Sequence, residues 1–107
     1  LEAGVHDLLD RGADAILTVV ESVPQIVSIL EGRGLRVGTD VRLVTLDEDV
    51  SGRLADAQIS TITLTGDDYA ETVVGALIDA IEGKAPTPIV IRGNPTLHPR
   101  ASSTGTA

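Results

Sequence analysis

The chain contains no cysteine, methionine, phenylalanine or tryptophan, and Tyr69 is its one aromatic residue. The absence of cysteine excludes disulfides and thiolate metal sites, and it is compatible with a reducing compartment. We therefore expect a cytoplasmic protein. Because 42% of the residues are hydrophobic and almost none is aromatic, the core must consist of Val, Ile, Leu and Ala.

Positive charge is also scarce, with 8 Lys and Arg against 16 Asp and Glu, for a formal net charge of −8. Nucleic-acid phosphates would be repelled, so this part of the protein is not expected to contact DNA. No apolar run approaches the roughly 20 residues needed to cross a bilayer, and no signal peptide opens the chain. At 107 residues it is one domain or part of one. Since the chain begins with Leu inside a helical pattern, we interpret it as a fragment of a longer protein.

The hydrophobic pattern predicts an α/β fold with a mostly parallel sheet flanked by helices. The predicted helices span 1–11, 22–31 and 67–82, with a short turn or helix over 50–57. Ser22 is the expected cap of the second helix, and Thr65 with Asp68 resembles a capping box before the last one. The predicted strands span 15–20, 41–46, 60–64, 89–92 and 96–98. Residues 101–107 offer no means of burying themselves, so 99–107 is expected to be a flexible tail.

Two segments suggest extensive burial. The strand over 15–20 is apolar except for Thr18, as expected for a strand covered on both faces. The helix over 67–82 is apolar around well over half its circumference, whereas packing on one sheet needs a stripe of about 100°. We expect this helix to pack on two sides, one of them against something outside this chain.

Acidic residues follow two of the predicted strands. Asp47, Glu48 and Asp49 come directly after the strand over 41–46, and Glu21 closes the strand over 15–20. Open α/β sheets bind ligands outside the carboxyl ends of their strands, so Asp47 is a candidate ligand contact and Glu21 could frame the same pocket. The acids could bind ligand hydroxyls, coordinate a hard cation, or cap the following turns and helices. A metal site is the least favoured, because the spacing of a calcium loop is missing.

No pattern in the chain indicates catalysis or a cofactor. The run Gly32-x-Gly34-x-x-x-Gly38 follows a helix and precedes a strand, the reverse of the order in a dinucleotide-binding loop. His6 and His98 are isolated in the sequence, without a Ser or Cys nucleophile arrangement.

Four segments resemble, in order, conserved motifs of the LacI/GalR family of transcriptional regulators. These are Ala13-Asp-Ala-Ile-Leu-Thr-Val-Val-Glu21, Val41-Arg-Leu-Val-Thr-Leu-Asp-Glu48, Ser60-Thr-Ile-Thr63 and Leu97-His-Pro-Arg-Ala-Ser-Ser103. They resemble the family's strand ending in Asn-Asp, its "vslvGfDd" strand, its "lTtv" strand and its closing "Lv-x-R-x-S-[ST]". The resemblance spans nearly the whole chain.

This resemblance implies the C-terminal portion of a two-lobed, periplasmic-binding-protein-like type I domain. Residues 1–107 would be a partial effector-binding and dimerisation domain. Asp47 matches the first acid of the "fDd" motif, which commonly contacts effector hydroxyls. Glu21 matches the Asp of the Asn-Asp pair, and Val20 replaces its Asn, which removes a polar ligand contact. The helix over 22–31 corresponds to a segment used in family dimers, and the helix over 67–82 to one that crosses to the other lobe.

The function implied is effector sensing by a homodimeric repressor, in which a sugar-like ligand changes DNA affinity through a helix-turn-helix domain outside this chain. A solute-binding protein of a sugar uptake system is the alternative, because it shares the fold. A helix-turn-helix upstream would favour the regulator, and a signal peptide would favour transport. An enzyme of the open α/β class is the third hypothesis, and it lacks a nucleophile, a base and a phosphate loop.

Overall fold

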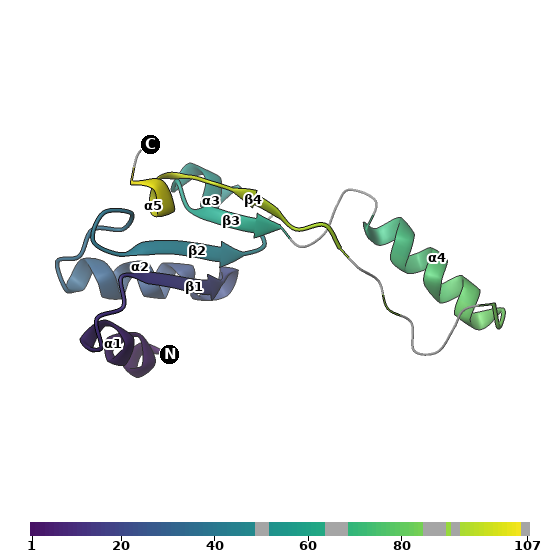
Figure 1. The fold of residues 1–107 in the computed structure, drawn as a ribbon, viewed down its shortest axis with the longest axis horizontal. Coiled ribbons are helices and arrows are strands. Elements are labelled where there is room, and N and C mark those ends of the chain that lie inside the picture. Colours follow the sequence, from purple (N-terminus) through teal and green to yellow (C-terminus); the bar gives the residue numbers. More distant parts are fainter. Residues whose placement is uncertain (49–51, 64–68, 85–89, 91–92, 106–107) are drawn as a thin grey trace. The chain divides into compact units, whose positions relative to one another are not determined.

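The chain forms two compact units in the computed structural model, which describes residues 1–48, 52–63, 69–84, 90 and 93–105. Unit 1 comprises Leu1–Thr63 and Leu97–Ala107, and unit 2 comprises Leu64–Thr96. Unit 1 contains the sheet with its short helices, and unit 2 contains the long helix α4 (Tyr69–Ile81) (Figure 1).

The sheet has the strand order β1-β2-β3-β4. Its strands are β1 (Ala15–Val19), β2 (Arg42–Leu46), β3 (Ser60–Thr63) and β4 (Thr96–His98). β1 pairs with β2 in parallel, and β2 pairs with β3 in parallel. β4 lies beside β3 at the far edge and runs in the opposite direction (Figure 1). This mostly parallel sheet, flanked by helices, confirms the predicted fold class.

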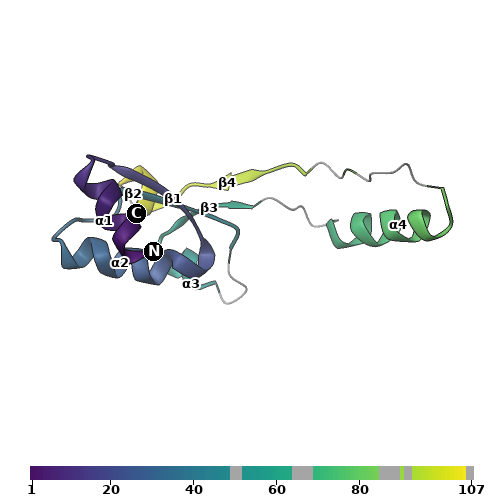
Figure 2. The same cartoon turned by 90° about the horizontal axis from the view of Figure 1, so that it is seen from below.

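Unit 1 also contains a 3-10 helix and short α-helices, two of which lie on the same side of the sheet. The elements are α1 (Glu2–Asp10), η1 (Val20–Ser22), α2 (Val23–Gly32), α3 (Arg53–Asp56) and α5 (Ala101–Thr104). Figure 2 shows α2 and α3 below the strands. Ser22 is at the N-cap position of α2, as predicted, but its side chain makes no capping hydrogen bond. Because η1 runs directly into α2, the backbone of Ser22 is already helical and not in the extended conformation that a cap requires.

The core of unit 1 is aliphatic, as predicted from the composition. It fills the space between the sheet and α2, where Ile26 and Leu30 lie one helical turn apart and are almost fully buried. The buried apolar residues are Val5, Ile16, Val23, Ile26, Leu30, Val41, Leu43, Leu54 and Ile59.

The opposite face of the sheet is open in unit 1. Leu17 is 62% exposed, Val19 47% and Leu97 57%. The expectation that the strand over 15–20 is covered on both faces is therefore wrong for β1. The reason is that α2 lies on one face of the sheet, where Ile16 is buried, whereas Leu17 and Val19 alternate onto the other face.

Residues 101–103 of the C-terminal segment pack against the sheet, so the prediction that this segment cannot bury itself is wrong for them. Ser102 in α5 is 2% exposed. Its hydroxyl accepts a hydrogen bond from the Ser60 N–H at 2.7 Å and donates one to the Leu43 carbonyl at 2.5 Å. A polar residue can be buried here because it satisfies backbone groups of β2 and β3. Residues 106–107 lie outside the described residues.

A glycine permits this close approach. Gly38 has φ +90°, and a Cβ at this position would overlap the carbonyl oxygen of Ala101. Only glycine satisfies both the positive φ and the limited space.

Unit 2 confirms the long predicted helix as α4, with Tyr69–Ile81 as its bounds. No residue of α4 is buried, and its apolar residues are 46–76% exposed at Tyr69, Val74, Leu77, Ile78 and Ile81. That this surface packs against something outside this chain stays a prediction.

The capping box at Thr65 and Asp68 lies outside the described residues, as does the strand over 89–92 except for Val90. Across the described ranges, no helix is long and apolar enough to cross a membrane.

Candidate functional site

The parallel pairing gathers the predicted site residues at one edge of the sheet. Val19 lies opposite Leu46, and Leu46 lies opposite Ile62. The residues that follow these partners therefore stand side by side at the carboxyl ends of β1, β2 and β3. They are Val20 and Glu21, then Asp47, then Thr63. We call this set the carboxyl edge.

Asp47 is at the centre of the carboxyl edge and has an unusual backbone. Its φ is 65°, in the left-handed region that L residues other than Asn and Asp rarely adopt. Its N–H donates a 2.7 Å hydrogen bond to the Ile62 carbonyl of the neighbouring strand. Within the described part of the chain its carboxylate is exposed and accepts no hydrogen bond. This carboxylate is therefore available to a ligand.

Glu21 and Val20 lie in η1 and have different environments. Glu21 is exposed, as an acidic residue in the first turn of η1. Val20 is partly buried and packs against the hydrophobic core. Val20 can contribute an apolar wall to a pocket, whereas Glu21 can contribute a charge.

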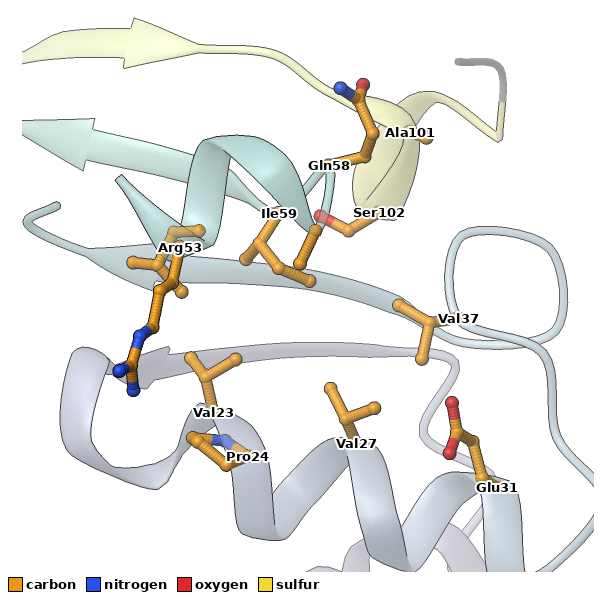
Figure 3. Close-up of a pocket in the computed structure, with 12 residues that line it drawn as sticks. Val23, Pro24, Val27, Glu31, Val37, Arg53, Gln58, Ile59, Ala101 and Ser102 are labelled. Carbon is orange, nitrogen blue, oxygen red and sulfur yellow. The ribbon is translucent and has the colours of Figure 1, made fainter. Parts of the chain in front are cut away.

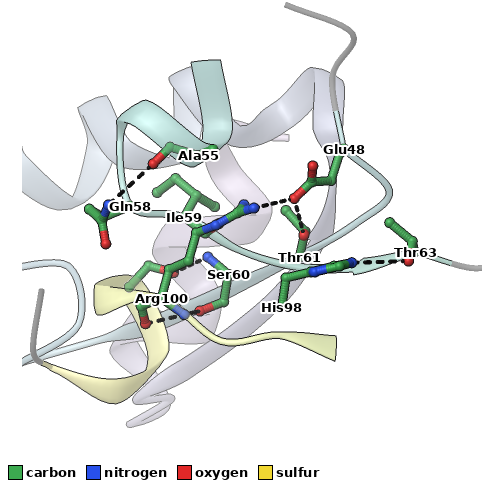
Figure 4. A network of polar contacts seen from close by, with 10 residues as sticks. Glu48, Ala55, Gln58, Ile59, Ser60, Thr61, Thr63, His98 and Arg100 are labelled. Carbon is green, nitrogen blue, oxygen red and sulfur yellow. Dashed lines mark hydrogen bonds and ion pairs between the residues drawn. The ribbon is translucent and has the colours of Figure 1, made fainter. Parts of the chain in front are cut away.

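Glu48 differs from Asp47 because its carboxylate already has partners (Figure 4). The Thr61 hydroxyl donates a 2.7 Å hydrogen bond to Oε1, and the Arg100 guanidinium pairs with the same oxygen. The hydrogen bond from Thr61, followed by that from Arg100, lowers the pKa of the Glu48 carboxyl below its ordinary value. Asp49 lies outside the described residues. The predicted acidic cluster therefore divides into an unpaired Asp47 and a paired Glu48.

The sequence left three roles open for these acids, namely binding ligand hydroxyls, coordinating a cation and capping the following turns and helices. The N-cap of α3 is Gly52, without a side-chain capping bond, so neither Asp47 nor Glu48 caps that helix. In the described ranges, no group of three or more His, Cys, Asp or Glu is placed to hold a metal ion.

Three residues at or near the carboxyl edge were not predicted from the sequence. Thr63 Oγ1 lies 3.2 Å from His98 Nε2, and Arg100 reaches Glu48 across 52 positions of sequence. Thr63 could have been found as the polar residue that ends β3. His98 therefore has a partner on the neighbouring strand, and His6 Nδ1 lies 3.0 Å from a guanidinium nitrogen of Arg33. Such contacts between distant segments leave no local pattern.

A concave surface lies between α2 and α3, on the helical side of the sheet. This α2–α3 groove has a volume of about 430 Å³, and its lining is mostly apolar. Figure 3 shows Arg53 at one end of the groove and Glu31 at the other. Val23, Pro24, Val27, Val37, Leu54 and Ile59 are among the residues between them.

Residues 5–103 match the family model of the periplasmic binding protein-like domain. The chain belongs to this family. No curated protein sequence matches the chain.

Solved structures of the periplasmic-binding-protein-like fold resemble the chain over nearly its full length. A LacI-type transcription regulator from Bifidobacterium animalis subsp. lactis has 28% identity and a TM-score of 0.73, over 95% of this chain and 38% of its own. The Escherichia coli transcriptional repressor ascG has 21% identity and a TM-score of 0.68, over 94% and 37%. A Lac repressor bound to ONPG in the repressed state has 22% identity and a TM-score of 0.67, over 94% and 31%. The predicted resemblance to LacI-type regulators is confirmed, and the chain spans 31–38% of the length of these three structures.

Proposed function

We propose that this chain is the effector-sensing and dimerisation portion of a LacI-type transcriptional repressor that binds a small, sugar-like ligand. The observation that supports this most directly is the exposed Asp47 carboxylate, which has no hydrogen-bond donor within the described residues and ends a central parallel strand. Ligands of open α/β sheets bind at this edge. The similarity to LacI-type structures supports the regulatory role.

The chemistry of the carboxyl edge suits a hydroxylated ligand. An ionised carboxylate accepts strong hydrogen bonds from ligand hydroxyls, and Asp47 would serve this role. Glu21 would offer a second acceptor from the neighbouring strand, and the apolar wall at Val20 would face the C–H surface of the ligand. Since Glu48 is already paired with Arg100, the edge would bind a neutral polyhydroxylated compound rather than a cation.

Control of DNA would then be allosteric. Ligand bound between this lobe and a second lobe would stabilise one relative arrangement of the two lobes, and that arrangement would set the spacing of two DNA-binding heads. The DNA-binding domain and the second lobe would lie outside this chain. A solute-binding protein of a sugar uptake system stays the alternative, because the family model describes the same domain. Catalysis is not part of either proposal.

The homodimer would form through the α2–α3 groove. This surface is apolar and concave, and a second copy could bury it by an isologous contact about a two-fold axis. The helix α2 lies in the segment whose LacI/GalR counterpart contributes to dimers, which supports this choice of surface.

A ligand screen tests the binding part of the proposal. The intact regulator, labelled with ¹⁵N, would be titrated with D-glucose, D-galactose, D-ribose and D-fructose, and amide shifts would be followed by NMR. At least one sugar should shift the amides of Glu21, Asp47 and Thr63 and leave those of the α2–α3 groove unchanged. Shifts confined to the groove, or no shift with any of these sugars, would contradict the proposal.

A further inference from the structure

Three segments that are far apart in the sequence meet at Glu48. Glu48 lies just after β2, and its Oε1 accepts a 2.7 Å hydrogen bond from the hydroxyl of Thr61 in β3. The same oxygen pairs with the guanidinium of Arg100, the residue before α5. We call these three side chains the Glu48 clamp (Figure 4). The side chain of Glu48 is 34% exposed and that of Arg100 is 17% exposed, so the ion pair lies at the surface with its arginine largely covered.

The Arg100 side of the clamp is itself held in place. Its Nη1 donates a 2.8 Å hydrogen bond to the Ile59 carbonyl, and its backbone N–H donates one of 2.8 Å to the Ser60 hydroxyl. Both bonds lead to the start of β3. Because Thr61 is also in β3 and fully buried, the clamp ties the turn after β2 to a rigid strand at two points.

The residue beside the clamp has a left-handed backbone, which Asp adopts more readily than most L residues. Asp47 is left-handed, and such a conformation in a residue other than glycine persists where the surroundings hold it. One restraint is the hydrogen bond from its N–H to Ile62. The other restraint within the described residues is the clamp, which fixes the next residue in the chain.

We propose that Glu48 is a positioning residue, whose contacts with Thr61 and Arg100 hold Asp47 in its left-handed conformation and direct the Asp47 carboxylate to ligand at the carboxyl edge. The ligand part of this inference rests on the proposed function, whereas the hold on the backbone does not. Glu48 would then contact no ligand, although it stands next to the contacting acid. The hydrogen bonds from Thr61 and Arg100 favour the ionised form of Glu48 and lower its pKa.

Amide hydrogen exchange measured by NMR on this chain tests the inference without any ligand. In Glu48→Ala, the Asp47 amide should exchange about 10-fold faster or more, while the Leu43 amide in the middle of β2 keeps its rate. Glu48→Gln keeps an acceptor oxygen for Thr61 and should give a smaller increase. Asp56→Asn, which neutralises an exposed acid on α3, is the matched control and should leave both rates unchanged.

The one-bond Cα–Hα coupling of Asp47, which reports the sign of φ, provides a second readout that a loss of global stability would not change. Glu48→Ala should move this coupling towards the value for negative φ. If that variant does not fold, Thr61→Val, which removes one donor at nearly constant shape, carries both measurements. An unchanged coupling, or exchange that accelerates equally at Asp47 and Leu43, would overturn the positioning role. Failure of every sugar to bind would remove the proposed function and leave this result standing.

Discussion

At the scale of single residues, Asp47 and Glu48 are neighbours in the sequence with opposite environments. Asp47 is exposed and, within the described residues, without a side-chain partner, whereas Glu48 is paired with Thr61 and Arg100. One carboxylate is therefore available for binding and the other stabilises the fold.

Glu48 should make the stability of the protein depend on pH in the acid range. Its pKa is lowered in the folded state, so its contribution is present above the ordinary glutamate pKa of about 4.3 and is lost as the pH falls through the folded value. Urea unfolding should show Glu48→Gln to be less stable than the wild type at neutral pH. The gap between the two should narrow as the pH falls below about 4.3. A gap of constant size down to about pH 3 would exclude this role.

Two glycines should respond oppositely to the same substitution. Gly38→Ala should lower the free energy of unfolding by about 1–3 kcal/mol or more, because of the positive φ and the overlap with Ala101. Gly4→Ala, inside α1 with open space around it, should raise it by about 0.5–1 kcal/mol. Chemical denaturation measures both values. Equal effects at the two positions would show that the contact between Gly38 and α5 does not form.

The position of Asp47 could be predicted from the sequence, whereas the partners of Glu48 could not. Asp47 comes directly after an apolar strand, and this local pattern places it at the carboxyl end of that strand. The pairing of Glu48 with Arg100 joins residues 52 positions apart, and neither residue type indicates the other. The division of the acidic cluster into a free and a paired acid therefore required the structure.

At the scale of elements, α5 is a very short helix whose stability comes from the strands beneath it. The hydroxyl of Ser102 satisfies the Ser60 N–H and the Leu43 carbonyl, and both bonds are buried. A helix of this length has too few internal hydrogen bonds to be stable alone.

Removing this hydroxyl should destabilise unit 1. Ser102→Ala leaves a buried donor and a buried acceptor without their partner, which costs about 1–3 kcal/mol. Ser28→Ala, on the exposed face of α2, is the matched control and should change stability by less than about 0.5 kcal/mol. Thermal or urea unfolding would compare the two variants. Equal, small effects would mean that α5 does not dock on the sheet.

Hydrophobic periodicity located most elements correctly, because burial on one face of the sheet sets the pattern of α2, β2 and β3. It was wrong for Ser102, which is buried through hydrogen bonds rather than through apolar area. It also predicted that both faces of β1 are covered, whereas Leu17 and Val19 are exposed in unit 1. The apolar run predicted the strand correctly, but it did not indicate which residues pack on each of its faces.

At the scale of the whole molecule, the proposed dimer has a charge pattern that can be tested. Arg53 and Glu31 lie at opposite ends of the apolar α2–α3 groove. An isologous contact with antiparallel grooves would place Arg53 of each copy near Glu31 of the other, twice in the same dimer.

Charge reversal should therefore separate the subunits, and mixing should rejoin them. Glu31→Arg alone or Arg53→Glu alone creates two like-charge pairs and should weaken the dimer by roughly tenfold or more in Kd. An equal mixture of the two variants restores two opposite pairs and should dimerise as the wild type does. Sedimentation equilibrium measures the oligomeric state and the Kd of the dimer. Asp14→Arg is the control, because it changes the charge by as much as Glu31→Arg does but lies outside the groove. A mixture that stays monomeric would place the dimer contact elsewhere.

The central claim, that Asp47 is the effector contact of a LacI-type sensor, is tested most directly by calorimetric titration of the intact regulator with the sugar that the screen identifies. Asp47→Asn keeps a residue type that tolerates the left-handed backbone and removes only the charge. We expect this variant to lose affinity by roughly tenfold or more, with an unchanged unfolding transition. Wild-type affinity in Asp47→Asn would show that Asp47 is not the effector contact.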